Sequence, residues 1–295
     1  MGWGCTSLRY SKPPPILPAT EESPFSGQAG GSADKRLDMN AATHRSRLPA
    51  AISALTLLLL ITPFVGLALV THWLDFHFAE GDGSAIAVSL GYSLLALILI
   101  IALGTPLAWW LARHPMRGKW LIDALLLLAL LTPPLAMGLL LASMYGPYGP
   151  AGHLLERAGL ILTNSAPAFI MAQFYSALPY YVIAARAAFE GVPRELEQIA
   201  LTLGHSPWRS FVHVSLPLAR LGLAAAVALA WVRALGEFGV VLIVAYYPQG
   251  IPVKLWVNLQ NIGLSAVYPL LWIFFLVAMP LPLILGLAAR RRRLI

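Results

Sequence analysis

Two oppositely charged residues stand four positions apart inside a long apolar run. Arg233 and Glu237 belong to the string RALGEFG, and residues with this spacing lie on the same face of a helix. A charge inside the hydrocarbon core of a membrane costs at least a few kcal/mol when it is unpaired, so we expect an ion pair between them or pairing with neighbouring helices. Structural pairing and the lining of a polar pathway both agree with this pattern, and the two roles are compatible.

The sequence lacks the motifs of several enzyme classes. It contains no Gly-x-x-x-x-Gly-Lys-Ser/Thr loop, no His-Glu-x-x-His and no Gly-x-Ser-x-Gly. Cys5 is the single cysteine, so the chain forms no internal disulfide and no four-cysteine metal site. The pair of Arg233 and Glu237 supplies no nucleophile. We therefore predict no catalytic residue, no metal site and no ATP bound by this chain.

Residues 190–217 form the longest well-punctuated amphipathic segment. Pro193 suits the first turn of a helix, and Glu195 and Glu197 follow it near the positive end of the helix dipole. Gly204 can adopt the left-handed conformation that ends a helix. We therefore expect a helix that begins near Pro193 and stops at Gly204.

The same segment carries an apolar stripe and a second helix start. The stripe has the spacing i, i+3, i+4 and i+7, and consists of Leu196, Ile199, Ala200 and Leu203. Ser206 and Pro207 signal a second, short helix, which we expect Pro217 to break. The pattern predicts a helix, a sharp turn and a helix, an arrangement that suits a docking surface.

This segment resembles the cytoplasmic loop of ABC importer permeases. The family pattern is Glu-Ala-Ala, three residues, Gly, nine residues and Ile-x-Leu-Pro. The matching residues are Gly204, Leu216 and Pro217, and the departures are Gln198-Ile199-Ala200 for Glu-Ala-Ala and Val214 for Ile. The resemblance implies a coupling helix that inserts into a groove on an ATP-hydrolysing subunit, with the acidic role held by Glu195 or Glu197, or absent. The alternative is an amphipathic loop that lies on the membrane surface.

Composition places the chain in a membrane. Of its 295 residues, 58% are hydrophobic and 11% are charged, and the mean hydropathy is +0.72, which excludes an ordinary soluble domain. Crossing about 30 Å of hydrocarbon takes roughly 20 residues of helix. Six apolar runs are long enough, approximately 50–71, 85–111, 120–145, 166–188, 218–246 and 267–289. We predict an all-α polytopic membrane protein with about six transmembrane helices.

The distribution of Lys and Arg predicts an orientation. These residues gather before the first run, after the second, around residues 190–217 and at the end of the chain, whereas the three intervening loops hold only Arg157 and Lys254. The positive-inside rule therefore places both termini and residues 190–217 in the cytoplasm. The net charge of +7 then reflects topology and gives no reason to invoke nucleic acid.

Residues 1–48 are polar and show no periodic apolar face. They contain Pro13-Pro14-Pro15 and scattered Gly and Ser, so we expect a disordered cytoplasmic tail. Met39, a few residues before the first apolar run, is an alternative initiator. Residues 49–295 would then form the permease domain, with the coupling loop at 190–217.

Several apolar runs are interrupted by proline or polar residues. Pro133-Pro134 stands inside the third run, where we expect a structural kink. Gln173 and Ser176 stand in the fourth run, where they either line a polar pathway or bond across helices. In the loop after the fifth run, Lys254 is a candidate contact for an external partner, and Tyr247 and Trp256 are expected as interfacial anchors.

The string around Arg233 and Glu237 also resembles a family signature. It is similar to the Leu-Gly-Glu-Phe-Gly element of molybdate, tungstate and sulfate permeases, and 245–248 resemble the molybdate and tungstate branches. The resemblance implies a non-enzymatic membrane subunit that imports molybdate or tungstate, with sulfate or thiosulfate as the alternative. It further implies a separate ATPase that binds ATP and Mg, an oxyanion-binding protein, a second permease copy and surrounding lipid. An ATP-independent carrier or channel is the alternative from another class.

Overall fold

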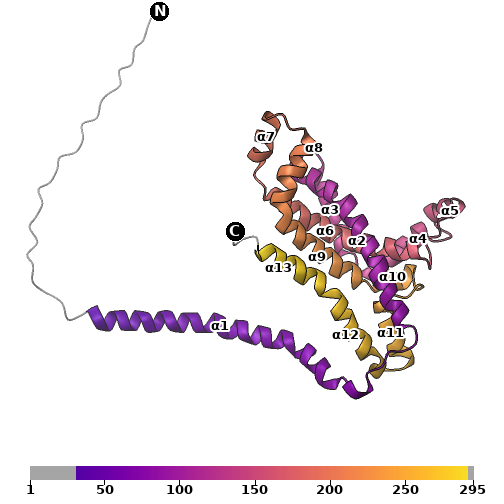
Figure 1. The fold of residues 1–295 in the computed structure, drawn as a ribbon, viewed down its shortest axis with the longest axis horizontal. Helices are drawn as coiled ribbons and strands as arrows, with labels where there is room; N and C mark the ends of the chain where they lie inside the picture. Colours follow the sequence, from indigo (N-terminus) through magenta and orange to yellow (C-terminus); the bar gives the residue numbers. More distant parts are fainter. Residues whose placement is uncertain (1–30, 292–295) are drawn as a thin grey trace, which may run out of the picture. The chain divides into compact units, whose positions relative to one another are not determined.

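The structure of the protein is a computed structural model that describes the backbone of residues 31–291 and the side chains of residues 49–288, Asp75 excepted. Within this part of the chain every regular element is helical, which confirms the predicted all-α fold (Figure 1). Five of the described helical stretches are long and apolar enough to cross a membrane, and a bent helix pair raises the number to six if it counts as one span. The protein is therefore a polytopic membrane protein.

The chain divides into two compact units, Met1–Gly66 and Leu67–Ile295. The first unit contains most of α1 (Gly31–Val70), whose stretch Pro49–Val70 is a candidate span. Residues 31–48, expected to be disordered, are helical here, because the stretch after Gly31 holds no proline until Pro49 and is rich in good helix formers. Residues 1–30 lie outside the described residues, and Met39 as an initiator stays a prediction.

Three long helices form the centre of the second unit. These are α2 (Asp82–Arg113), α6 (Ala166–Glu190) and α9 (Leu216–Leu235). Small side chains let their backbones approach closely: a Cβ at Gly222 would lie 2.4 Å from the Cβ of Ala188, and one at Gly104 would lie 2.7 Å from the ring of Tyr181. The core between these helices is apolar, with fully buried Leu235 among its members.

The third predicted span is broken in two. In place of one helix over 120–145, α3 (Lys119–Leu131) and α4 (Pro134–Tyr145) meet at an angle of 111°. Thr132 and Pro133 have extended ψ angles of 123° and 141°, because a residue that precedes proline avoids the helical region. The expected kink is confirmed, and it divides the predicted run 120–145 into two helices. Beyond α4, the short helix α5 (Pro150–Arg157) follows.

Pro217 was predicted to end the second helix of this segment, but the helix continues through it. The helical run passes from α8 (Pro207–Ser210) through a π-helical turn, η2 (Phe211–Ser215), into α9, and the whole of Pro207–Leu235 is a candidate span. The N–H of Leu216 bonds to the carbonyl of Phe211, five residues earlier. This wider turn gives the ring of Pro217 room where a regular helical turn would produce a clash.

The fifth predicted span ends earlier than expected. Helix α9 stops at Leu235, and after a short break α10 (Gly239–Val244) begins, so 218–246 is not one helix. Gly236 and Gly239 weaken helix propensity on both sides of Glu237. Helix α10 packs against α4 at two glycines, where a Cβ on Gly138 would lie 2.9 Å from the Cβ of Ile243.

The second glycine of this contact yields a prediction. A Cβ on Gly239 would lie 2.7 Å from the Cβ of Pro134 and 3.2 Å from the backbone N of Leu135. We expect Gly239→Ala to push α4 from α10 and to cost about 1–3 kcal/mol, as overpacking does. Thermal unfolding of the purified protein measures this loss. Gly91→Ala in α2, where a Cβ meets nothing within 4 Å, is the control, and equal melting temperatures for both variants would contradict the tight contact.

The stretch 246–266, expected to be an external loop, contains a helix. Gly250 and Pro252 start α11 (Ile251–Asn261), because proline suits the first turn. The chain then continues through η3 (Leu264–Ala266), α12 (Val267–Ala278) and α13 (Pro280–Arg291). Near the start of α2 lies the short turn η1 (Trp73–Asp75). In Figure 1, α11 and the start of α2 lie at the end of the bundle opposite α7 and α8.

Candidate functional site

The turn at Gly204 forms as predicted. Helix α7 (Arg194–Thr202) follows Pro193, and Gly204 has a positive φ of 88°. The N–H of His205 bonds to the carbonyl of Ala200 at 3.0 Å, and this closes the end of the helix. Ser206 then caps α8, with its hydroxyl accepting from the N–H of Arg209 at 3.3 Å. The predicted first helix, the turn and the start of the second helix are therefore confirmed to within two residues.

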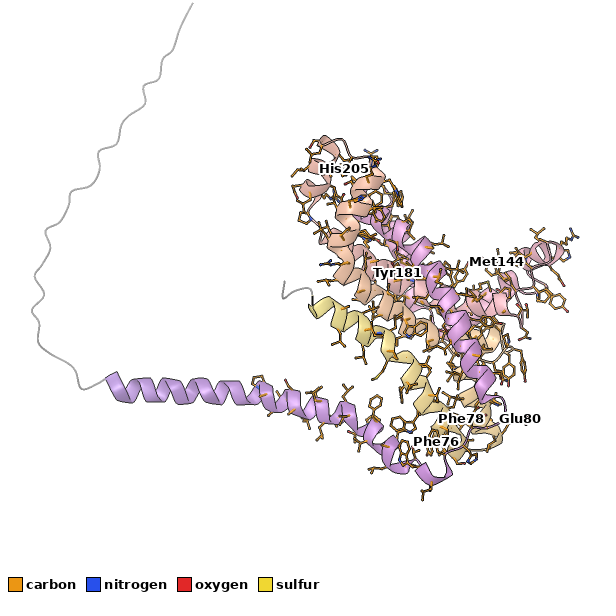
Figure 2. The ribbon with its side chains drawn as sticks, viewed as in Figure 1. Phe76, Phe78, Glu80, Met144, Tyr181 and His205 are labelled. Atoms are coloured by element: carbon orange, nitrogen blue, oxygen red, sulfur yellow. The ribbon has the colours of Figure 1, made fainter. Side chains whose placement is uncertain are left out.

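The predicted apolar stripe faces outward. Among its members only Ala200 is buried, whereas the side chain of Leu203 is 76% exposed and that of Trp208, on the next helix, is 70% exposed. We call four of the exposed apolar side chains of this region the docking face: Leu196, Ile199, Leu203 and Trp208. Figure 2 shows the turn, marked by His205, at the far end of the bundle from Glu80. A face of this kind suits a protein partner.

Glu197 points inward and joins three elements. Its Oε1 accepts from Nε of Arg113 at 2.8 Å and from the hydroxyl of Ser215 at 2.5 Å. Arg113 also donates to the carbonyl of Val192 at 3.2 Å. The two charged side chains are largely buried, at 7% and 14% exposed. We call this the Arg113–Glu197 joint; it ties α7 to the end of α2 and to the π-helical turn before α9.

The residues predicted for coupling therefore separate into two groups. Glu195, Gln198 and Ile199 are exposed, whereas Glu197 and Ala200 face the protein. Leu216 and Pro217 begin α9 and belong to a span. The ion pair of Arg113 was not predicted, because this residue counted only among the positive charges that follow the second apolar run. Its place as the last residue of α2 was the available signal, since a cation that is buried there needs a counter-ion from another element.

A second arrangement surrounds Arg233 and Glu237. The predicted pair is present, since Nη1 of Arg233 donates to Oε2 of Glu237. Glu237 stands in the break between α9 and α10 and is only 1% exposed. Its Oε1 accepts from the N–H of Val240 at 2.8 Å, which satisfies a free donor at the start of α10. Arg233 and Glu237 therefore do not share one helix as predicted. The carboxylate of Glu237 instead links Arg233 on α9 to the first turn of α10.

Arg233 borders a depression of about 750 Å³. Its guanidinium lies 5.6 Å from the centre of the Tyr180 ring, and its side chain is 25% exposed. Trp256, expected as an interfacial anchor, also lines this space and lies 5.9 Å from the ring of Phe238. We call this space the Arg233 depression; its lining residues are Pro133, Pro134, Leu135, Tyr180, Arg233, Gly236, Glu237, Phe238, Gly239, Leu242 and Trp256.

Two further polar residues singled out in the sequence hold helices together. Nε2 of Gln173 donates to the hydroxyl of Ser93 at 2.8 Å, so this buried side chain bonds α6 to α2. Nζ of Lys254 donates to the carbonyl of Glu80 at 2.6 Å, which ties α11 to the segment before α2. Within the described residues, no three His, Cys, Asp or Glu side chains gather where they could hold a metal ion.

Comparison with known proteins gives a consistent picture. Residues 104–293 match the family model described as "Binding-protein-dependent transport system inner membrane component". The chain is 42% identical over 59% of its length to a probable molybdenum ABC transporter permease protein of Haloferax volcanii, and the match spans 64% of that relative. It is 38% identical over 56% of its length to a molybdenum transport system permease protein of Azotobacter vinelandii, covering 74% of that protein.

Solved structures share the fold. A bacterial alginate ABC transporter, crystallised in complex with an alginate-bound periplasmic protein, superposes with a TM-score of 0.67 at 18% identity. The superposition covers 87% of this chain and 96% of the transporter chain. At this identity the likeness concerns the path of the backbone alone.

Proposed function

Since the chain belongs to the family of binding-protein-dependent transport system inner membrane components, we propose that it is the membrane-spanning subunit of an ATP-driven importer. The observation that carries the proposal is the docking face, an exposed apolar surface on α7 and α8 that the Arg113–Glu197 joint fixes to the spans. ATP and Mg would bind to a separate ATPase subunit that covers this face. The ends of the chain and the docking face would lie in the cytoplasm, where the positive charges gather.

The connections of the docking face suggest how movement would reach the membrane. Helices α8 and α9 form one helical run, Pro207–Leu235, which ends two residues after Arg233. The joint adds a second connection, from Glu197 to the end of α2. Closure of two ATPase subunits on ATP would therefore displace α2 and α9 as stiff bodies and open the pathway outward. A second copy of this chain would supply the other side of that pathway.

We propose molybdate as the transported ion and tungstate as the second choice. The Haloferax and Azotobacter relatives are named for molybdenum, and the described spans contain a cation, Arg233, at a depression. Molybdate and tungstate are tetrahedral dianions, and the guanidinium group recognises paired oxygen atoms. Sulfate has the same shape and charge and is the competing substrate. A separate oxyanion-binding protein would deliver the ion.

The experiment is ATP-dependent uptake in proteoliposomes that contain this chain, its ATPase and its binding protein. We expect molybdate uptake that needs ATP, all three components and an intact docking face, and that resists excess sulfate. If sulfate displaced molybdate, the importer class would stand and the substrate would change. Uptake that is indifferent to ATP and to the ATPase would show an independent carrier and refute the proposal.

The docking face itself can be tested by one substitution. Leu203 is largely exposed, so Leu203→Asp should leave the fold intact. If the face lies against the ATPase, a buried unpaired carboxylate there would cost several kcal/mol and the two subunits should no longer copurify. Thr202→Asp, at the end of the same helix, is the control with the matched change of charge. Copurification of the Leu203→Asp variant at the wild-type level would argue against this face.

A further inference from the structure

We propose that the Arg233 depression is a transient binding site for a tetrahedral oxyanion, and that Glu237 is a built-in competitor that keeps its affinity low. The inference rests on the proposed function and adds to it a site within the membrane subunit. Arg233 would hold the anion with the edge that Glu237 leaves free, and Glu237 would stay bound to Arg233 throughout.

Two helix breaks meet at this depression. One is the Pro133-Pro134 break between α3 and α4, and the other is the break at Gly236 between α9 and α10. Backbone that is not helical is tolerated at membrane depth only where it is buried in protein or lines a polar cavity. Both breaks line the same space, which places two irregular backbone segments beside Arg233.

Arg233 has donors left for such a ligand. Its Nη1 is engaged with Glu237, whereas in the described part of the chain Nε and Nη2 make no hydrogen bond. These two nitrogen atoms form one edge of the guanidinium, and such an edge binds two oxygen atoms of an oxyanion side by side. Tyr180 stacks near the group at 5.6 Å and helps to hold its plane.

Glu237 limits how tightly the site can bind. Its carboxylate is almost fully buried and fixed at both oxygen atoms, by Arg233 and by the N–H of Val240. The negative charge therefore stays beside the cation and opposes any anion that approaches it. Translocation requires binding strong enough to admit the ion and weak enough to release it, and a fixed counter-charge achieves this balance.

The decisive variant replaces both charges. Arg233→Gln with Glu237→Gln leaves no buried charge unpaired, so a purely structural pair should be replaced without loss of uptake. We expect normal yield and normal ATP hydrolysis but molybdate uptake reduced about tenfold or more, as for loss of a charged hydrogen bond. Arg157→Gln, which removes an exposed cation from α5, is the control and should transport normally. If the double variant folds poorly, Arg233→Lys tests the inference instead, because it keeps the positive charge and loses the paired donors of the guanidinium. We expect reduced molybdate uptake for this variant as well.

Glu237→Gln tests the competitor role by direct binding. The purified complex of this chain with its ATPase is heated with sodium molybdate or with sodium chloride at matched ionic strength. We expect a larger rise of melting temperature with molybdate for Glu237→Gln than for wild type, and none for the double variant. Equal shifts in all three proteins, or wild-type uptake by the double variant and by Arg233→Lys, would overturn the inference. Absence of uptake by the wild-type complex would instead refute the proposed function.

Discussion

Replacing Gly204 with valine is expected to abolish coupled uptake while the spans remain folded. Gly204 has a φ of 88°, and a β-branched side chain in the left-handed region costs about 1–3 kcal/mol. A Cβ at this position would meet nothing within 4 Å, so the expected loss of coupled uptake arises from backbone strain, without a steric clash. The turn would relax toward a negative φ and would swing the apolar side chains of α7 away from those of α8.

The controls for this variant separate backbone strain from docking. Gly204→Asn should retain most uptake, because asparagine tolerates the left-handed region. Gly159→Val places the same strain at a φ of 80° in the connection after α5, again with open space around the Cβ, and should leave coupling intact. The measurements are molybdate uptake, ATP hydrolysis and copurification with the ATPase. Wild-type uptake by Gly204→Val would show that the angle of this turn does not matter for coupling.

The elements with local signals could be predicted from the sequence. Pro193, Gly204 and Ser206 mark the ends of α7 and α8 through rules that act within one turn, and the structure follows them. Pro217 carries an equally strong local signal, yet the helix continues through it by means of a wider turn. Whether a proline ends a helix depends on the packing around it, and a local pattern does not contain that information.

The site divides in the same way. The spacing of Arg233 and Glu237 was enough to predict their ion pair. The depression beside it needs Tyr180 from α6 and Trp256 from α11, which the fold brings in from distant parts of the sequence. From the sequence alone, Trp256 was expected as an interfacial anchor. Its place beside Phe238 depends on the position of helix α11, which the sequence pattern does not give. Contacts between remote elements follow from the tertiary structure, and one sequence does not reveal them.

Glu197→Ala is expected to destroy both assembly and transport. Arg113 is 7% exposed and receives its charge balance from this single carboxylate among the described residues, so the substitution leaves a buried cation unpaired. Breaking a buried pair in this way costs about 3–5 kcal/mol. The start of α7 would detach from α2 and from Ser215, and the docking face would lose its fixed position. Yield of the complex, copurification with the ATPase and uptake all measure the effect.

Two further variants show what the joint contributes beyond stability. Glu195→Ala removes an exposed carboxylate from the same turn and should change little. Arg113→Met with Glu197→Leu replaces the pair by apolar side chains of similar length, a change that often restores stability. If the double variant regains folding and copurification but transports poorly, the charged joint transmits the movement of α7 to α2. If it also regains full uptake, the joint serves only to hold the helix in place, and α9 alone carries the movement toward Arg233.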